Sequence, residues 1–498
     1  MKKDTKVPIL LLALYSSGII IGGGILALPF TALNTGVLGC ILLLVGFAIV
    51  FNYTYWRILG VITDTLKHVG EVTESLYDLA IDYSGLGAVG KIAFDLGLLM
   101  YTIPADFVYI LYGSKSMCEL HELLPQNTIL YAFVIWLFIC LILSALYVVG
   151  IHLVSMVKIS AIVTIWLLGI LISRSFYSAV IFFSISLLFL RYFPEKFKRP
   201  KMKEMKTNKI IILPHHESSA WFTLTKILLI CATPIAGLIL VFVCSSSLYF
   251  PDLFPQDAFG LISPMGVILF MYVGTGIYNI LIYDWIRESF EHQKKISLLA
   301  IIISLMTYLV FTLSIIFSVD VPILIKTNAE REHALMAMSE KLRIIGLTLA
   351  SYLVIVLADL FAMLSVSVAF VGFTDSLSNR FKIRFRINEN IFWVITLAIS
   401  TILVSLSEVF HIVNAATDAL GFAGAAGGGL FILILPWLLR TNGYKRKLFV
   451  AFSMFLMCLS FNLIATMSSA TLAGRISGLI SSVILIISSG FLFKKALK

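Results

Sequence analysis

Long apolar runs, separated by short charged segments, occupy most of the chain. A helix needs about 20 apolar residues to cross roughly 30 Å of hydrocarbon, and most of the runs reach that length. The strict alternation over about 10 residues that is typical of membrane strands does not occur. The pattern therefore predicts fourteen transmembrane helices, near residues 8–32, 36–56, 90–113, 128–149, 154–173, 176–192, 225–248, 262–284, 296–318, 343–372, 390–408, 416–439, 448–467 and 475–493.

The runs near 176–192 and 225–248 are the weakest of these, and the positions of Lys and Arg test them. Short cytoplasmic loops collect basic residues. If both runs cross and the N-terminus is inside, most of the 37 Lys and Arg residues lie on the cytoplasmic side. If neither run crossed, the basic segment 191–226 would lie outside the cell. If only one crossed, the basic loops 380–386 and 440–447 would lie outside. We therefore expect fourteen spans with both termini in the cytoplasm, and twelve spans as the alternative.

The composition supports this interpretation. The chain has 498 residues, of which 60% are hydrophobic and 13% charged, and its mean hydropathy is +1.01. Soluble domains have an apolar fraction nearer half, so an all-α integral membrane protein in the cell membrane is expected. The net charge of +10 comes from basic residues spread over short loops, without a basic patch interleaved with aromatic residues. It therefore indicates topology, and the expected surroundings are the lipid bilayer and no nucleic acid.

Several kinds of chemistry have no sequence signal. The six cysteines are scattered, without the spacing of a disulfide framework or a zinc site, and the pair His215 and His216 makes no metal signature. No phosphate-binding loop and no nucleophile with its base is present. The N-terminal lysines and apolar run imitate a signal peptide, but no cleavage site follows, so a retained first span is expected. We expect no enzyme and no resident cofactor or metal.

Three consecutive glycines, Gly22, Gly23 and Gly24, lie inside the first apolar run and are followed by Pro29. Each glycine costs roughly 0.5–1 kcal/mol relative to alanine in a helix interior. Close packing of neighbouring helices is one explanation. A broken helix is the other, because backbone groups freed inside a membrane must face protein, water or a ligand. The second half of a broken helix presents free amides and a positive dipole end, which suit a carboxylate.

A second break is expected in the run near 262–284. Gly274 and Gly276 flank Thr275 in the middle of this run, and Pro264 precedes it. A single Gly-x-Gly is a weak signal, but here it recurs at the middle of a second span. Two broken helices are typical of secondary transporters that bind their substrate near the middle of the bilayer.

Three stretches resemble a known family. "GIIIGGGILALPF" resembles the first helix of the amino acid, polyamine and organocation transporter superfamily. "DLFAMLSVSVAFVGFTDSL" and "LGFAGAAGGGLFILILPWLL" are similar to later helices of the aromatic and hydroxy amino acid permease family, and the last stretch is the most specific. The residues between 174 and 250 do not match, which is expected if they form an insertion.

The resemblance implies a LeuT-like fold, which consists of two inverted five-helix repeats with broken first and sixth core helices. The first repeat would occupy 1–173 and the second 251–440. An inserted helical hairpin with a basic cytoplasmic loop would occupy 174–250, and two further helices 441–498.

The resemblance also implies a substrate site between the two broken helices. The amides of Gly23 and Gly24 would face a substrate carboxylate, the carbonyls of Ile20 and Val273 would accept from its ammonium group, and Phe270 would cover it. The residues expected to bind the substrate are therefore Ile20, Gly22, Gly23, Gly24, Phe270, Val273, Gly274, Thr275 and Gly276.

Ionisable residues inside the spans are candidates for ion coupling. Asp359 lies near the centre of the run 343–372, where charge costs at least roughly 2.5–3.5 kcal/mol, so a proton-carrying role is the hypothesis and a packed, hydrogen-bonded acid the alternative. Lys158 could serve similarly or extend to the nearby interface. Ser365 and Ser367 could supply hydroxyls to sodium or bond their own backbone. The coupling ion is expected to be a proton, with sodium as the alternative.

These features favour a secondary transporter, a symporter of a neutral amino acid that is aromatic or bulky and apolar. An acid that could pair with a cationic substrate side chain is absent beside Gly274. The alternative is an amino-acid sensor or receptor with the same fold and no net transport.

Overall fold

The computed structural model describes residues 9–69, 76–123, 165–171, 175–192, 214–245, 265–273, 290–330, 332–412, 415–439, 444–468 and 472–497. In these ranges every regular element is helical. The elements are α1 (Ile9–Ile20), η1 (Gly23–Ala27), α2 (Leu28–Val69), α3 (Leu76–Tyr83), α4 (Gly87–Leu123), α7 (Phe176–Tyr192), α8 (Pro214–Ser245), α11 (Phe290–Ser318), α12 (Val321–Ala329), α13 (Ala334–Ile344), α14 (Thr348–Phe385), α15 (Glu389–Val409), α16 (Ala415–Phe422), η3 (Ala423–Ile434), α17 (Leu435–Leu438), α18 (Tyr444–Ser468) and α19 (Leu472–Ala496). Residues 265–273 form a further helical segment.

The lengths and hydropathies of these helices confirm a multi-pass membrane protein. Eight of the described helices are long and apolar enough to cross a bilayer, and three shorter ones, Gly24–Leu33, Phe176–Arg191 and Ile230–Cys244, are also apolar. The predicted span near 128–149 lies outside the described residues, and of the span near 154–173 only residues 165–171 are described, as helix. The number of fourteen spans and the cytoplasmic location of the termini therefore stay predictions.

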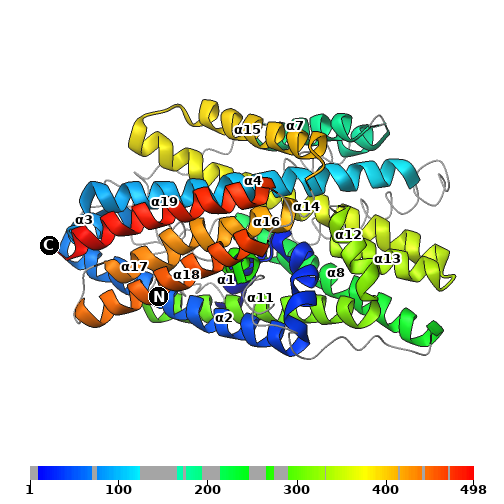
Figure 1. The fold of residues 1–498 in the computed structure, drawn as a ribbon, viewed down its shortest axis with the longest axis horizontal. Helices are drawn as coiled ribbons and strands as arrows, with labels where there is room; N and C mark the ends of the chain where they lie inside the picture. Colours follow the sequence, from blue (N-terminus) through cyan, green and yellow to red (C-terminus); the bar gives the residue numbers. More distant parts are fainter. Residues whose placement is uncertain are drawn as a thin grey trace, which may run out of the picture.

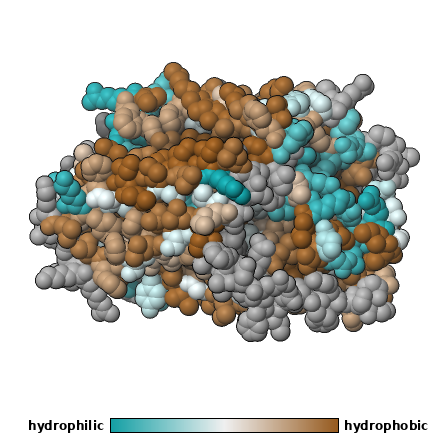
Figure 2. Space-filling model, in the orientation of Figure 1, coloured by the Kyte–Doolittle hydropathy of each residue, from teal (hydrophilic) through white to brown (hydrophobic). Residues whose placement is uncertain are grey.

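The long helices run roughly along the longest axis of the molecule (Figure 1). Helices α4 and α14 pack along each other inside the bundle, α2 packs on α11, and α7 packs on α15 at the periphery. The short helices α12 and α13 lie at the end of the bundle opposite the C-terminal end of α19. Figure 2 shows a largely hydrophobic face, with hydrophilic residues gathered toward the end that carries α12 and α13. This is the surface expected of a protein embedded in lipid.

Gly36 separates the first two predicted spans. Its φ of 67° lies in the left-handed region, which glycine adopts without the steric cost of a Cβ atom. The boundary at Gly36 agrees with the predicted gap between residues 32 and 36.

The polar segment after α11 is partly helical. It forms α12 and α13, which ion pairs join: Lys341 Nζ lies 2.7 Å from Asp320 Oδ2, and Lys326 Nζ lies 3.0 Å from Glu340 Oε1. Helix α13 also packs on α14. The connection between α11 and α14 is therefore part of the packed bundle.

The two helices expected as an inserted hairpin, α7 and α8, occupy different places. Helix α7 packs against α4 and α15, whereas α8 packs against α1 and α11. Figure 1 shows them on opposite sides of α14. The division of the chain into two repeats, an insertion and two final helices stays a prediction.

The glycine-rich stretch near the C-terminus forms η3, a π-helix, which packs on α4. A Cβ atom at Gly427 would lie 2.5 Å from the backbone nitrogen of Tyr101, and one at Gly424 would clash with the carbonyl oxygen of Gly266. Glycine is therefore required here for close approach of backbones, as is common between membrane helices. This packing holds α4 against segment 265–273.

Candidate functional site

The first helix is broken where the three glycines predict it. Helix α1 ends at Ile20, and Gly22 adopts an extended conformation with φ −96° and ψ −161°. The chain resumes as η1, where Ile25 N–H donates to Gly22 C=O at 3.4 Å. The amides of Gly23 and Gly24 come before this bond, so the helix itself supplies them with no acceptor. The break is thus present at the predicted residues.

Segment 265–273 lies directly against this break. A Cβ atom added to Gly24 would lie 3.0 Å from Met271 Cγ and 3.1 Å from Phe270 Cδ1. The ring of Phe270 stacks on that of Tyr101 in α4, with 4.8 Å between centroids and 21° between planes. The structure therefore brings Gly24 and Phe270 together, as the resemblance implies, and no room is left for a side chain at residue 24 without movement of its neighbours.

Three buried tyrosines place their hydroxyls at successive backbone carbonyls of this segment. Tyr101 donates to the carbonyl of Phe270 at 3.2 Å and Tyr55 to that of Tyr272 at 2.6 Å, while the Tyr308 hydroxyl lies 3.4 Å from the carbonyl oxygen of Met271. In an uninterrupted helix these carbonyls would accept from the amides of residues 274–276. Side chains are among the groups that satisfy carbonyls which a helix leaves free at its end. The pattern is consistent with the second predicted break.

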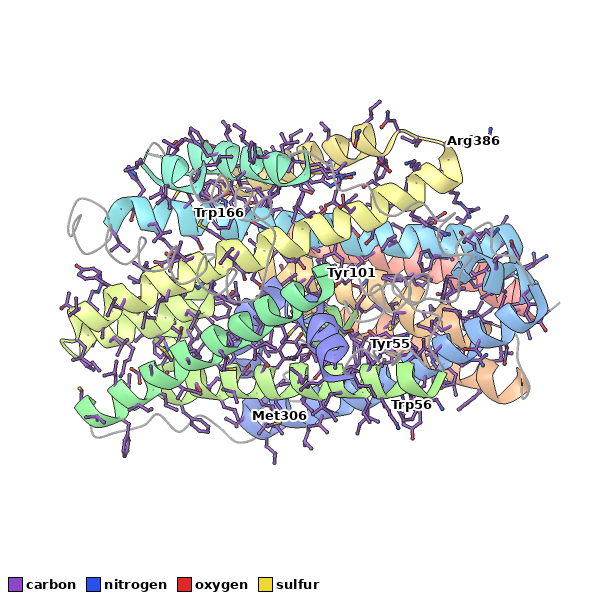
Figure 3. The ribbon with its side chains drawn as sticks, turned by 180° about the vertical axis from the view of Figure 1, so that it is seen from behind. Tyr55, Trp56, Tyr101, Trp166, Met306 and Arg386 are labelled. Carbon is purple, nitrogen blue, oxygen red and sulfur yellow. The ribbon has the colours of Figure 1, made fainter. Side chains whose placement is uncertain are left out.

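Tyr308 also links this segment to the first break. Its hydroxyl lies 2.8 Å from the carbonyl oxygen of Ile20, the last residue of α1. Tyr308 is buried, as are Tyr55 and Tyr101, and Figure 3 shows Tyr55 and Tyr101 inside the bundle while Met306 lies at its edge. The carbonyl of Ile20, predicted to accept from a substrate ammonium, also accepts from Gly22 N–H at 2.8 Å, so both of its lone pairs are already used.

The walls of this site carry no formal charge. Residues 20–28 and 265–273 include no acidic or basic side chain. The acid nearest to Tyr101 along α4 is Asp106, which is buried and accepts a hydrogen bond from Thr374 Oγ1 at 2.9 Å. Backbone amides, carbonyls and aromatic rings therefore dominate the chemistry at the break.

Some predicted site residues cannot be placed. Gly274, Thr275, Gly276 and Lys158 lie outside the described residues, and Val273 is the last residue of its described segment. Their roles stay predictions.

Asp359 lies in a second cluster, which the sequence did not predict as a cluster. Its side chain is fully buried on α14, and its Oδ1 lies 2.9 Å from Nε2 of His333, the residue before α13. Glu119 of α4 completes the group, and one ligand atom from each of the three residues lies within 4.8 Å of the others. We call these three residues the Glu-His-Asp cluster.

Two of the three cluster residues were missed from the sequence for identifiable reasons. The predicted span ended near residue 113, whereas α4 continues to Leu123 and carries Glu119 into the bundle. His333 lies in the polar connection, where a histidine attracts no attention. The sequence signal that could have indicated the cluster was Asp359, because an acid buried inside a span requires polar partners.

The pKa values of His333 and of the neighbouring residue Glu332 are both shifted. Burial raises the pKa of Glu332 to about 7, and the neighbouring Glu330 acts in the same direction. Burial lowers the pKa of His333, against the opposing effect of Glu119 and Glu332. His333 is thus a neutral imidazole at neutral pH, with a ring nitrogen free to accept or to coordinate.

The hydroxyls of Ser365 and Ser367 are buried in α14. Neither has a hydrogen-bond partner among the described residues, so they do not bond their own backbone there. Their contact with sodium stays a prediction.

Comparison by sequence gives no relatives: no protein family and no curated protein matches this chain. Comparison by structure gives similar folds. The chain is similar to a manganese transporter of Eremococcus coleocola solved with an aromatic bis-isothiourea substituted compound, with a TM-score of 0.55, 10% identity, and 99% of this chain and 97% of that chain covered. A mutant of the same transporter gives a TM-score of 0.50 at 9% identity, with the same coverage.

The fold is therefore that of a multi-pass membrane transporter, and these structural neighbours are transporters, not enzymes. Membership of the amino acid, polyamine and organocation superfamily is not confirmed by these matches. They likewise give no support for an amino acid as the substrate.

Proposed function

We propose that this protein is a secondary active transporter that moves a small neutral amino acid across the cell membrane by alternating access. The observation that carries the proposal is the interrupted α1 at Gly22–Gly24, packed under Phe270 and opposite the tyrosine-bonded carbonyls 270–272. Discontinuous helices that meet in this way form the substrate sites of many secondary transporters.

The chemistry of the break suits a zwitterion. The amides of Gly23 and Gly24, at the start of the second half-helix, offer donors and the positive end of a helix dipole to a carboxylate. The carbonyl of Val273 can accept from an ammonium group, whereas that of Ile20 already accepts from Tyr308 and from Gly22 N–H. Phe270 offers an apolar wall to the substrate side chain. The absence of charged side chains in 20–28 and 265–273 favours a neutral substrate, aromatic or bulky and apolar, over a cationic one.

Symport with a proton or sodium is the proposed source of energy. Asp359 is the main candidate for the residue that binds the coupling ion, and Ser365 and Lys158 are further candidates. Asp359 is buried on α14, a helix that also contacts η1 at the break. A change in the charge of this helix can therefore be communicated to the substrate site.

A divalent metal ion is the second candidate substrate. The structural neighbours named above are manganese transporters, and the Glu-His-Asp cluster offers metal-ligating side chains. The described walls of the break, however, contain no carboxylate or imidazole. A sensor with the same fold and without net transport is a further alternative, and it would bind an amino acid without accumulating it.

Uptake by proteoliposomes tests the substrate class. We expect radiolabelled tryptophan, tyrosine or a branched-chain amino acid to accumulate under an inward proton or sodium gradient. Radioactive Mn²⁺ is tested in parallel with the same vesicles, and protein-free vesicles are the control. Accumulation of Mn²⁺ alone would replace the amino acid by the metal ion. Binding of an amino acid without uptake would indicate the sensor.

A further inference from the structure

We propose that the Glu-His-Asp cluster binds one divalent first-row transition-metal ion, through Glu119, His333 and Asp359. The proposal goes beyond transport at the helix break, because it assigns a second site on other helices. Its ligands come from α4, from the connection between α12 and α13, and from α14.

The geometry matches a coordination site. His333 Nε2 and Asp359 Oδ1 are 2.9 Å apart, and the ligand atoms of the three residues lie within 4.8 Å of one another. Metal–ligand bonds to His and to carboxylates are about 2.0–2.2 Å, so two ligands of one ion lie roughly 3–4.3 Å apart. The observed separations therefore require only small adjustments of the side chains to place an ion between them.

The cluster also has an unused polar atom. Nδ1 of His333 is buried and lacks a hydrogen-bond partner within the described part of the chain, and the Asp359 carboxyl group interacts with the carboxyl group of Glu119 and with Ser116. Asp359 and His333 are 0% and 1% exposed, so water does not reach these side chains from the surface. Buried polar groups without partners are rare in native proteins, and an absent ion is one explanation for them.

The charge of the cluster points to a cation. Two carboxyl groups meet one imidazole, and no Lys or Arg of the described residues forms an ion pair with either acid. Lys115, one turn before Glu119 on α4, instead lies 5.2 Å from the centre of the Phe176 ring. Two carboxylates buried together are costly unless protons or a metal ion neutralise them.

The set of ligands selects a class of metal. Imidazole with carboxylates suits Mn²⁺, Fe²⁺, Co²⁺ and Zn²⁺, whereas Mg²⁺ and Ca²⁺ prefer oxygen ligands alone. Each described cluster residue can give one ligand atom, so water or a second carboxylate oxygen would complete the coordination. An ion there would join the α12–α13 connection to α4 and α14, at the end of the bundle that those two short helices cover.

Metal binding to the full-length protein in detergent tests the proposal. After treatment with a chelator, the protein is dialysed against Mn²⁺ or Zn²⁺, and the bound metal is measured by mass spectrometry. We expect one ion per chain for the wild type. Asp359→Asn and His333→Gln should lower the affinity by at least about 100-fold, which exceeds the 10–100-fold typical for loss of an outer-shell partner. Mg²⁺ at equal concentration should not compete.

Two control variants separate loss of ligands from general damage. His411→Asn replaces an exposed histidine, and Glu340→Gln a carboxylate on α13, both outside the cluster. They should bind metal as the wild type does. The absorption spectrum of bound Co²⁺ should change in His333→Gln, because a nitrogen ligand is lost. No bound metal in the wild type, or equal affinity in Asp359→Asn and the wild type, would overturn the proposal. These measurements need no gradient and no amino acid, so their outcome is independent of the transport assay.

Discussion

Two clusters of charged side chains both include residues of α4 and α14, and they differ in charge balance. The first consists of Asp78, Asp95, Arg380 and Arg384, and we call it the arginine network. Arg380 donates through its terminal nitrogens to both carboxylate oxygens of Asp78, and its Nε lies 2.7 Å from Asp95 Oδ1. Arg384 Nε lies 2.6 Å from Asp95 Oδ2. Two acids are thus matched by two arginines.

The second is the Glu-His-Asp cluster, which lies about 36 Å further along α4, counted from Asp95 to Glu119 at 1.5 Å per residue. Its two acids lie beside His333, and among the described residues no lysine or arginine forms an ion pair with them. A buried acid that is paired with arginine needs nothing else, whereas two acids without a cation must take up protons or an ion. The arginine network thus balances its own charge, whereas the Glu-His-Asp cluster is the place where we propose that a metal ion binds.

Arg380→Met should have the largest effect on stability. It leaves Asp78 and Asp95 buried without their main partner, and breaking such a pair typically costs about 3–5 kcal/mol. We expect a strongly lowered midpoint of thermal unfolding in detergent. Arg343→Met is the matched control, because Arg343 is an exposed arginine on α13. An unchanged midpoint for Arg380→Met would show that the network does not stabilise the fold.

Asp359→Asn, unlike Arg380→Met, should not destabilise the protein when metal is absent. Without metal it removes one of two like charges, so the midpoint of thermal unfolding should stay the same or rise. With metal at about 100 times its dissociation constant, the wild type should gain about 2.7 kcal/mol of stability, and the variant should lose this gain. The measurement is thermal unfolding with and without Zn²⁺. Strong destabilisation in the absence of metal would mean that Asp359 is a structural acid like Asp95.

Arg384→Ala should destabilise the arginine network less than Arg380→Met does. It leaves Arg380 to serve two acids, which brings the arginine network closer to the charge imbalance of the other cluster. Arg384 is partly exposed, at 17% of its side chain, so water replaces some of the lost interaction. We expect destabilisation of about 1 kcal/mol, at the upper end for exposed ion pairs. A loss as large as that of Arg380→Met would show that the network acts as one unit.

The sequence predicted features that depend on neighbouring residues. The break at Gly22–Gly24 follows from local backbone preferences, and the depth of Asp359 follows from the apolar residues around it. The spans seen as α7, α11, α15, α18 and α19 likewise follow from hydropathy. Each of these properties is encoded within about 20 consecutive residues.

Partners that are distant in the chain could not be predicted. Tyr308 donates to Ile20 across 288 positions, and Arg380 pairs with Asp78 across 302. A single sequence contains no signal for such pairings, since any buried tyrosine or arginine within a span could serve. The extension of α4 to Leu123 was also missed, because charged residues after 113 interrupt its apolar pattern. The metal-ligating group therefore emerged only from the packing of helices.

The central claim is that substrate binds and is transported at the break in α1. The most direct test is uptake of the amino acid that the wild type accumulates, by proteoliposomes that contain Gly24→Leu or Gly46→Leu. Gly24 faces Phe270 and Met271, whereas a Cβ atom at Gly46 would meet nothing within 4 Å, so Gly46 is the matched control on a helix surface. We expect Gly24→Leu to abolish both binding and uptake, and Gly46→Leu to keep both. Uptake by Gly24→Leu at the wild-type rate would contradict the account.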